Sequence, residues 1–372
     1  MNPLSTLKYL KTHKKKVITS SLIIGLSIFL ILFMQVEIRG LSDGFYLSTE
    51  RLKFFSEGLA KTESVNDNIN KQLIEDGAME KIVPSIKRRS SMKSSIGVDT
   101  ELIIYGMESG DIEFMLKKLG LKIKEGGLGS NDGKSIILSE MIANNKGVKV
   151  GDTLSKNNDN YLYIDGEYTV AGILEGKVNV AFIPTSEMKI SSIDTKNYLY
   201  FWNEGYENKV NLVLLDNKSS DFQISTYEKD KISIEDFSES FTLISNIIIV
   251  LMIIIQGVIL AFTNYSEYYQ RREEFGVAKA LGFKEKSILI RIFKEIFILS
   301  AIGFLLGIIL IYTYLFIINS FDFTRGVPPY RIIVDDIFKV IVIPVVITLS
   351  SVLPIAKLIR NTDTLKIIDG GI

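Results

Sequence analysis

The chain is 372 residues long, and its 43 basic residues balance its 43 acidic residues, so net charge gives no reason to expect nucleic-acid binding. It has no cysteine, which excludes disulfides, thiolate nucleophiles and cysteine-bound metals. Its single histidine, His13, excludes a histidine-based triad and a multi-histidine metal site.

Four long apolar runs dominate the sequence, at 17–36, 241–263, 296–318 and 340–356. None contains a charged residue, and each is close to the roughly 20 residues with which a helix crosses a bilayer. The first could instead be a cleaved signal peptide, because Lys14, Lys15 and Lys16 precede it. It is long for one, however, and no small-residue cleavage site follows. We therefore expect four membrane helices, at 17–37, 241–263, 296–318 and 337–358.

Lysine and arginine indicate which loops face the cytoplasm. They concentrate in the leader (1–16), in the loop between the second and third helices (264–295) and in the tail (359–372). The loop 319–336 has only Arg325 and Arg331, beside three aspartates. Because positive charge marks the cytoplasmic side, we expect a multi-pass cell-membrane protein with both termini in the cytoplasm. Residues 38–240 then form a large extracytoplasmic domain, and 319–336 an external loop.

The two ends of the external region are expected to continue the membrane helices as stalks. Over 38–70, Leu41, Phe45 and Leu52 fall on helix-like spacings, and 231–240 leads into the second membrane helix without a proline. A flexible linker is the alternative for these segments. Residues 84–97, which are rich in basic residues and serine, are interpreted as a loop.

Between the stalks the pattern alternates between strands and helices. We expect strands at 102–105, 178–183 and 210–215, and a helix at 111–119 with Ile112, Met115, Leu116 and Leu119 on one face. Residues 161–164 and 168–170 flank a turn at 165–167 and predict a hairpin. The fold class is therefore an α+β membrane protein, with one plus three membrane helices and a mixed α/β domain after the first.

The segment 126–135 looks at first like a phosphate-binding loop. That motif needs glycine, four residues and then Gly-Lys-Ser, but Leu128 stands where the first glycine belongs and Gly127 is one place early. Residues 135–138 also favour a strand, so no helix N-terminus would face a phosphate. We interpret the segment as a surface turn, and the scattered external carboxylates as solvated surface.

The most informative short segment is 271–283, between the second and third membrane helices. Phe275, Ala278 and Leu281 lie three apart on one face of a short helix, and Gly282 suits a helix stop. A short amphipathic helix at the membrane face can rest on lipid or bind a groove on a soluble partner. The alternative is a simple turn between two spans.

With this segment the chain resembles the FtsX-like and MacB-like permeases of ABC transporters. The one-plus-three helix order is similar to that family, and so is Arg272-Glu273 followed by Ala280-Leu281-Gly282. Further similar segments are 135–140, 147–154, 168–173, 180–184 and 354–357. The sequence departs from the family in the tail, where a proline before a leucine is missing and Thr364 precedes Leu365.

The resemblance implies a permease subunit that is not itself an enzyme. Two permease chains, identical or different, pair in the lipid bilayer and bind a cytoplasmic ABC ATPase dimer, which binds the ATP, so this chain needs no cofactor. An external adaptor protein is a further partner in this family. The implied ATPase-coupling residues are Arg271, Arg272, Glu273, Phe275, Ala278, Leu281 and Gly282.

The implied function is mechanotransmission. ATP hydrolysis by the partner moves the extracytoplasmic domain, which exports or extracts an amphiphile such as a peptide, a lipid-linked molecule or a haem-like compound. The alternative is a machine that transports nothing and regulates an external cell-wall hydrolase or a sensor kinase. For the pairing of chains we expect small residues to pack closely: Gly303 and Gly307 in the third membrane helix, and Ser21 and Gly25 in the first.

Overall fold

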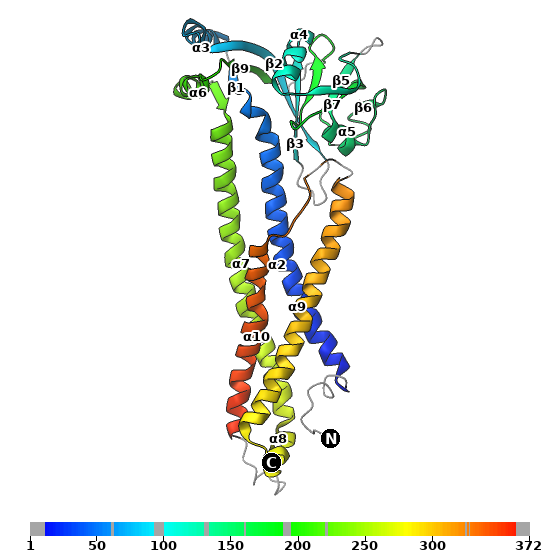
Figure 1. Cartoon of the computed structure of the whole chain (residues 1–372), viewed down its shortest axis with the longest axis vertical. Coiled ribbons are helices and arrows are strands. Elements are labelled where there is room, and N and C mark those ends of the chain that lie inside the picture. The colour runs from blue at the N-terminus through cyan, green and yellow to red at the C-terminus, as the bar shows by residue number, and fades with distance from the viewer. Residues whose placement is uncertain are drawn as a thin grey trace. The chain divides into compact units, whose positions relative to one another are not determined.

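The computed structural model describes residues 12–60, 63–92, 100–129, 134–159, 161–188, 195–219, 222–323, 326 and 328–361. The chain divides into two compact units (Figure 1). We call the first the helix unit, formed by Met1–Ile38, Ser240–Ile317 and Arg331–Ile372. The second is the sheet unit, formed by Arg39–Glu239 and Ile318–Tyr330.

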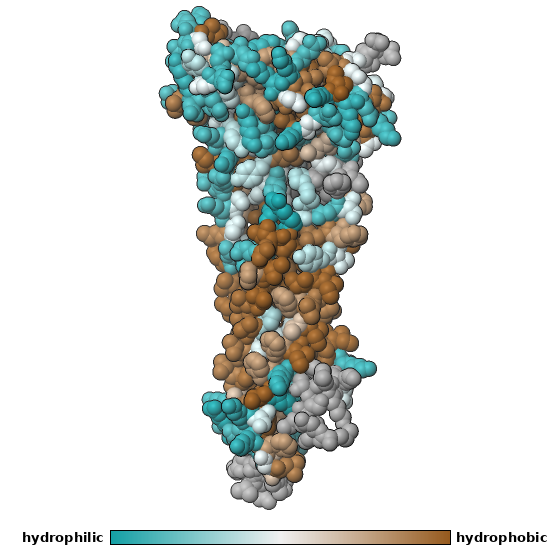
Figure 2. All heavy atoms as spheres, viewed as in Figure 1, coloured by the Kyte–Doolittle hydropathy of each residue, from teal (hydrophilic) through white to brown (hydrophobic). Residues whose placement is uncertain are grey.

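Four long helices are apolar and long enough to cross a membrane. They are α2 (Lys14–Thr49), α7 (Tyr227–Gln270), α9 (Glu285–Phe323) and α10 (Val334–Asn361). Figure 2 shows hydrophobic residues gathered over the middle of these helices. The predicted order of one helix, a large domain and three helices is confirmed.

Hydrogen bonds between polar side chains join neighbouring helices within the helix unit. Gln35 on α2 donates to the Ser245 hydroxyl on α7 at 2.6 Å. Asn264 on α7 donates to the Ser351 hydroxyl on α10 at 3.0 Å. Such bonds act together with close side-chain packing, because lipid leaves little hydrophobic drive between helices.

The predicted stalk helices exist, but the first is shorter than expected. Residues 231–240 lie in α7, whereas α2 stops at Thr49 and a short 3-10 helix, η1 (Glu50–Lys53), follows. A continuous helix over 38–70 is therefore wrong: α2 ends at Thr49, and residues 63–70 belong to a separate helix, α3 (Glu63–Glu75). Strand β1 (Ser56–Ala60) lies between them instead. It pairs on both sides with strands that are distant in the sequence, and such pairing can outweigh the helical preference of the local sequence. A Cβ at Gly58 would meet the Phe222 ring at 2.7 Å, so glycine is required for this close pairing.

The described strands of the sheet unit form one mixed sheet. Its order is β10-β1-β9-β2-β3-β8-β5-β7-β4, and β6 pairs with β7. Pairs β3–β8 and β5–β7 are parallel and the other pairs are antiparallel. The bounds of the strands after β1 are Met79–Met92 (β2), Thr100–Met107 (β3), Lys122–Gly126 (β4), Ser135–Ser139 (β5), Thr153–Ser155 (β6), Glu167–Glu175 (β7), Ala181–Pro184 (β8), Thr195–Trp202 (β9) and Phe222–Ser225 (β10).

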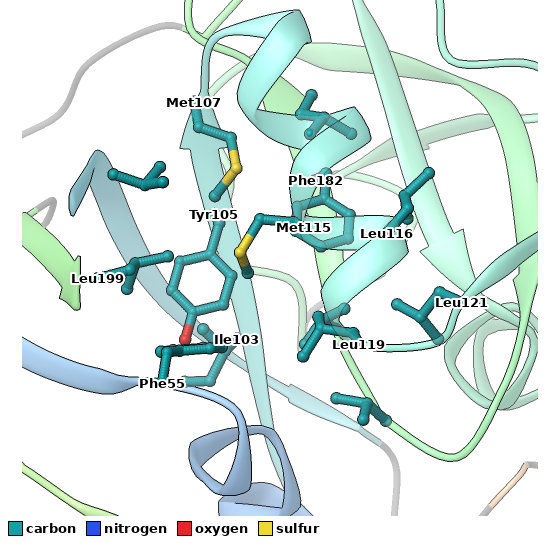
Figure 3. Packing of buried hydrophobic residues seen from close by; sticks show 14 of the residues in the cluster. Phe55, Ile103, Tyr105, Met107, Met115, Leu116, Leu119, Leu121, Phe182 and Leu199 are labelled. Atoms are coloured by element: carbon teal, nitrogen blue, oxygen red, sulfur yellow. The ribbon is translucent and has the colours of Figure 1, made fainter. Parts of the chain in front are cut away.

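Helices cover both faces of this sheet. Their bounds are Glu63–Glu75 (α3), Ser109–Lys118 (α4), Glu140–Lys146 (α5) and Glu207–Asp216 (α6). The four predicted inward residues of α4 all lie in one apolar core with Tyr105 and Phe182 (Figure 3). Residues of α3 and α6 pack with Tyr200 and Phe222 in a second core on the opposite face of β9 and β10.

Three local predictions in the sheet unit are wrong. Residues 84–92 belong to strand β2, which pairs with β9 and β3, and 93–97 lie outside the described residues. Residues 210–215 belong to helix α6, where Val210 and Leu214, one turn apart, face the core. Residues 161–164 form no strand, and β7 begins at Glu167 just after Gly166, which has a positive φ of 106°.

The predicted strands at 102–105 and 135–138 lie within β3 and β5, and β8 covers only the end of the predicted strand at 178–183. A strand and not a helix therefore follows the segment that looks like a phosphate-binding loop. Residues 130–133 of that segment lie outside the described part of the chain.

Candidate functional site

The segment between α7 and α9 contains a short helix, α8 (Arg272–Ala280), close to the predicted one. It ends in the hydrogen bonds of a Schellman motif: the Gly282 N–H donates to the Lys279 carbonyl at 2.9 Å, and the Phe283 N–H to the Ala278 carbonyl at 3.1 Å. Gly282 has a φ of 86°, which favours glycine over any other residue. The predicted helix stop at Gly282 is therefore confirmed.

The inward face of α8 packs on the other helices of the helix unit. Phe275 is only 3% exposed, and its ring centroid lies 6.1 Å from that of Tyr268 on α7. The partly buried Ala278 packs against the same cluster, which also contains Ile288, Ile292 and Ile296 of α9 and Ile355 and Ile359 of α10. Phe275 and Ala278 thus hold α8 against its own chain.

A buried carboxylate, Glu295 on α9, joins the start of α8 to α7 and α9. It has no exposed surface, and its Oε2 accepts a hydrogen bond from the Tyr268 hydroxyl at 2.9 Å. The guanidinium groups of Arg291 and Arg271 lie 2.9 Å and 3.4 Å from its two oxygens. Arg271 also lies over the rings of Tyr268 and Phe275 and bonds to Glu274. We call Glu295, Tyr268, Arg271 and Arg291 the Glu295 cluster.

Two lysines extend these contacts to the remaining helices. Lys279 of α8 donates to the Ile359 carbonyl of α10 at 2.6 Å and pairs with Glu285 of α9 at 2.9 Å. Lys16 of α2 pairs with Glu267 of α7 at 2.5 Å. Helix α8 is therefore attached to α7, α9 and α10, and α7 in turn to α2.

The outward face of α8 carries a stripe of one carboxylate and two apolar side chains. Glu273, Val277 and Leu281 lie four residues apart, and all three are exposed, with Val277 53% and Leu281 73% exposed. Beside them, Arg272 donates to the Tyr269 hydroxyl at 2.7 Å. We call Glu273, Val277 and Leu281 the α8 outward stripe, which offers an apolar surface with a flanking charge to another molecule.

Phe275, Ala278 and Leu281, which were predicted to share one face of the helix, do not all face the same way. Phe275 and Ala278 face inward and Leu281 faces outward, because successive steps of three residues drift around a helix. Sequence reasoning named Arg271 but missed Val277 and the other members of the Glu295 cluster, Glu295, Tyr268 and Arg291. Two signals were present: the spacing of four between Val277 and Leu281, and the spacing of four between Arg291 and Glu295 at the start of an apolar span. The roles of these residues in docking stay a prediction.

The four small residues that were predicted to pack between chains face one another within one chain. A Cβ at Gly25 of α2 would lie 3.1 Å from the Gly303 carbonyl of α9, and a Cβ at Gly307 would lie 2.9 Å from the Gly25 carbonyl. Ser21 donates to the Leu299 carbonyl at 3.2 Å. The four residues therefore allow α2 and α9 to approach closely, and their packing between two chains stays a prediction.

Comparisons with solved structures find similar domains at low identity. The periplasmic region of MacB from Actinobacillus actinomycetemcomitans is 15% identical, with a TM-score of 0.29 over 49% of this chain and 92% of that one. The extracellular domain of the noncanonic ABC-type transporter YknZ from Gram-positive bacteria is 16% identical, with a TM-score of 0.29 over 46% and 99%. A domain of a putative permease from Porphyromonas gingivalis is 15% identical, with a TM-score of 0.27 over 46% and 88%.

No curated protein sequence matches the chain. The membrane part of the chain, however, matches a protein family. Residues 246–364 match the family described as FtsX-like permease C-terminal, a stretch that contains most of α7 and the whole of α8, α9 and α10. Since four of its helices are also apolar and long enough to span a bilayer, the chain is a membrane protein. In residues 246–364, the chain is therefore similar to the FtsX-like permeases.

Proposed function

We propose that the chain is the permease subunit of an ABC transporter and is driven by a separate cytoplasmic ATPase dimer. The observation that carries this proposal is the combination of two faces on α8. Its outward stripe is exposed, and its inward face is fixed to α7, α9 and α10 by Phe275 and by the Glu295 cluster. A force applied to the stripe would move α8 together with these helices.

The length of α7 supports transmission of that movement. It runs as one helix over Tyr227–Gln270, so it joins the β10 side of the sheet unit to α8 without an interruption. The interior of the helix unit is filled largely by isoleucine, including Ile28, Ile249, Ile343 and Ile347. A packed apolar interior favours movement of the sheet unit over passage of an ion through water in this chain.

In this proposal a second permease chain pairs with this one in the bilayer, and the sheet unit lies outside the cell. ATP is bound and hydrolysed by the partner, and the permease itself carries out no chemistry. The moving sheet unit exports or extracts an amphiphile, with an external adaptor protein as a further partner. The residues proposed to receive the force are those of the outward stripe, with Arg272 beside them.

The absence of cysteine from the chain permits a direct test. Leu281→Cys introduces a single thiol at the outward stripe. In membranes that contain the chain and its ATPase, a short reagent that is thiol-reactive at one end and photoreactive at the other should cross-link this position to the ATPase, which mass spectrometry identifies. Leu212→Cys is the matched control, because Leu212 is also an exposed leucine, 61% accessible, but lies in the sheet unit.

A second experiment separates docking from folding. Val277→Asp and Leu281→Asp together should abolish co-purification of the ATPase without lowering the thermal midpoint of the purified chain, since both side chains are exposed. Phe275→Asp is unsuitable, because that side chain is buried in the chain's own core. Unchanged ATPase binding in the double variant, together with no cross-link from position 281, would contradict the proposal.

A further inference from the structure

The sheet unit contains a cavity that the proposed function does not use. Its volume is about 490 Å³, within the range of roughly 300–1,000 Å³ that is usual for ligand sites. Strands β10, β1, β9 and β2 provide most of its wall. Its polar lining includes Glu57, Lys87, Arg89, Tyr163, Asn197 and Gln223.

The strand register places these side chains on one face of the sheet. Glu57 lies opposite Ser225, and Leu59 lies opposite Gln223, and opposed residues of antiparallel strands share a face. On β9, Asn197 is followed at every second position by Leu199 and Phe201, which belong to an apolar core. The cavity is therefore the polar end of an otherwise apolar face, on the side opposite to α3 and α6.

The charges at the cavity are balanced by partners of opposite sign. Glu57 is 4% exposed and contacts Lys87, the Tyr105 hydroxyl and the Arg51 guanidinium, the last at 3.3 Å. Arg89 lies 3.1 Å from Glu101. The charged side chains thus stabilise the walls, and the cavity favours an uncharged ligand over an ion.

Among the described residues that line the cavity, Asn197 has a buried amide donor without a hydrogen-bond partner. Asn197 is 3% exposed, lines the cavity, and its Nδ2 donates to no acceptor within the described part of the chain. A buried amide donor without an acceptor destabilises the folded chain, because its lost hydrogen bonds to water are not replaced. A ligand with a carbonyl oxygen could supply the missing acceptor and so gain binding free energy. Tyr163, 44% exposed, presents an aromatic ring and is fixed by a bond from its N–H to the Ser90 hydroxyl at 2.9 Å.

We propose that this cavity binds an uncharged sugar with an acetamido group. The acetamido carbonyl accepts a hydrogen bond from Asn197, the sugar hydroxyls bond to Gln223 and Ser225, and the apolar side of the ring packs on Tyr163. An extended peptide fits less well, because three of the four wall strands, β1, β9 and β2, are each paired on both sides, which leaves only β10 at the edge of the described sheet. This proposal does not depend on coupling to an ATPase.

Calorimetric titration of the full chain in detergent tests the proposal with defined probes. Chitobiose, the neutral disaccharide of N-acetylglucosamine, should bind, and cellobiose, which lacks the acetamido groups, should bind about tenfold more weakly. Asn197→Leu and Tyr163→Ala should each weaken chitobiose binding by about tenfold. Tyr206→Ala is the control, because Tyr206 is 40% exposed and does not line the cavity.

Folding is checked in the same samples. Asn197→Leu should leave the thermal midpoint unchanged or raise it, because it removes an unpaired buried donor. Should that variant not fold, Gln223→Ala, at an exposed position, provides the same comparison. The proposal is overturned if chitobiose does not bind at millimolar concentration, if the cavity variants bind it as the unaltered chain does, or if cellobiose, inorganic phosphate or a blocked dipeptide binds equally well.

Discussion

At the level of single residues, the buried Glu295 is where the attachment of α8 is most vulnerable. Its carboxylate is fully buried, balances the charges of Arg271 and Arg291, and accepts a hydrogen bond from the Tyr268 hydroxyl. Removing one partner of a buried ion pair leaves the other charge uncompensated, at a cost of about 3–5 kcal/mol. The start of α8 should therefore loosen when this charge is lost.

We expect Glu295→Gln to lower the thermal midpoint of the purified chain and to weaken stimulation of the ATPase by the permease. The substitution keeps the size of the side chain and removes its charge. Glu273→Gln is the matched control for the thermal midpoint alone, since Glu273 is an exposed glutamate of α8 but belongs to the outward stripe. A midpoint that is the same in Glu295→Gln and Glu273→Gln would show that the Glu295 cluster does not hold α8.

A second residue, Glu57, gives the sheet unit a pH-dependent stability. Burial alone would raise the pKa of Glu57, but Lys87 and Arg51 outweigh burial and lower that pKa from 4.5 to about 2. Because the folded-state pKa is depressed, the contribution is complete above pH 4.5 and is lost as pH falls toward 2. A depression of this size corresponds to about 3 kcal/mol at neutral pH.

The fluorescence of Trp202, the only tryptophan of the chain, can follow this effect because it packs in the sheet unit. The urea midpoint of the sheet unit should fall as pH is lowered from 4.5 toward 2. Glu57→Gln should lower the midpoint at pH 7 and reduce its decline in acid. A decline in acid as steep as that of the unaltered chain would contradict this account of Glu57.

At the level of elements, the contact between α2 and α9 depends on the absence of side chains. A Cβ at Gly307 would lie 2.8 Å from the Ile28 Cβ and 2.9 Å from the Gly25 carbonyl, closer than ordinary packing. In contrast, a Cβ at Gly257 of α7 would meet Ser350 and Val346 of α10 at 3.6 Å, which is ordinary contact. The two glycines form a matched pair for testing which contact is tight.

We expect Gly307→Ala to destabilise the helix unit by about 1–3 kcal/mol through overpacking. Gly257→Ala should be tolerated, because it meets no clash and alanine favours a helix over glycine. Thermal unfolding of both variants in detergent measures the difference. If Gly307→Ala leaves the unfolding midpoint unchanged and only separates paired chains, the glycines act between chains, as the sequence first indicated.

At the level of the whole molecule, the sequence predicts those parts that depend on neighbours along the chain. The four membrane helices follow from uninterrupted apolar runs, and the inward face of α4 from a spacing of three and four residues. Strands β1 and β2 could not be predicted, because Gly58 and the charged Lys87 and Arg88 fit a sheet only through partners far away in the sequence.

The same limit applies to the candidate site. Helix α8 and its end at Gly282 could be predicted from the spacing of apolar residues in 271–283 and from the glycine itself. The inward position of Phe275 was not, because it is decided by isoleucines of α9 and α10 that contact α8 only after the helices pack. The Glu295 cluster likewise forms only when Arg291 and Glu295 of α9 pack against Tyr268 of α7 and Arg271, which lies between α7 and α8.

The proposed coupling requires a membrane between the sheet unit and α8, and single-cysteine labelling tests this requirement most directly. Val150→Cys and Val277→Cys each place one thiol at an exposed position of a chain without cysteine. In intact cells a membrane-impermeant maleimide should label position 150 and leave position 277 unlabelled until the cells are lysed. Labelling of both positions, or protection of both, in intact cells would place them in one compartment and contradict the account.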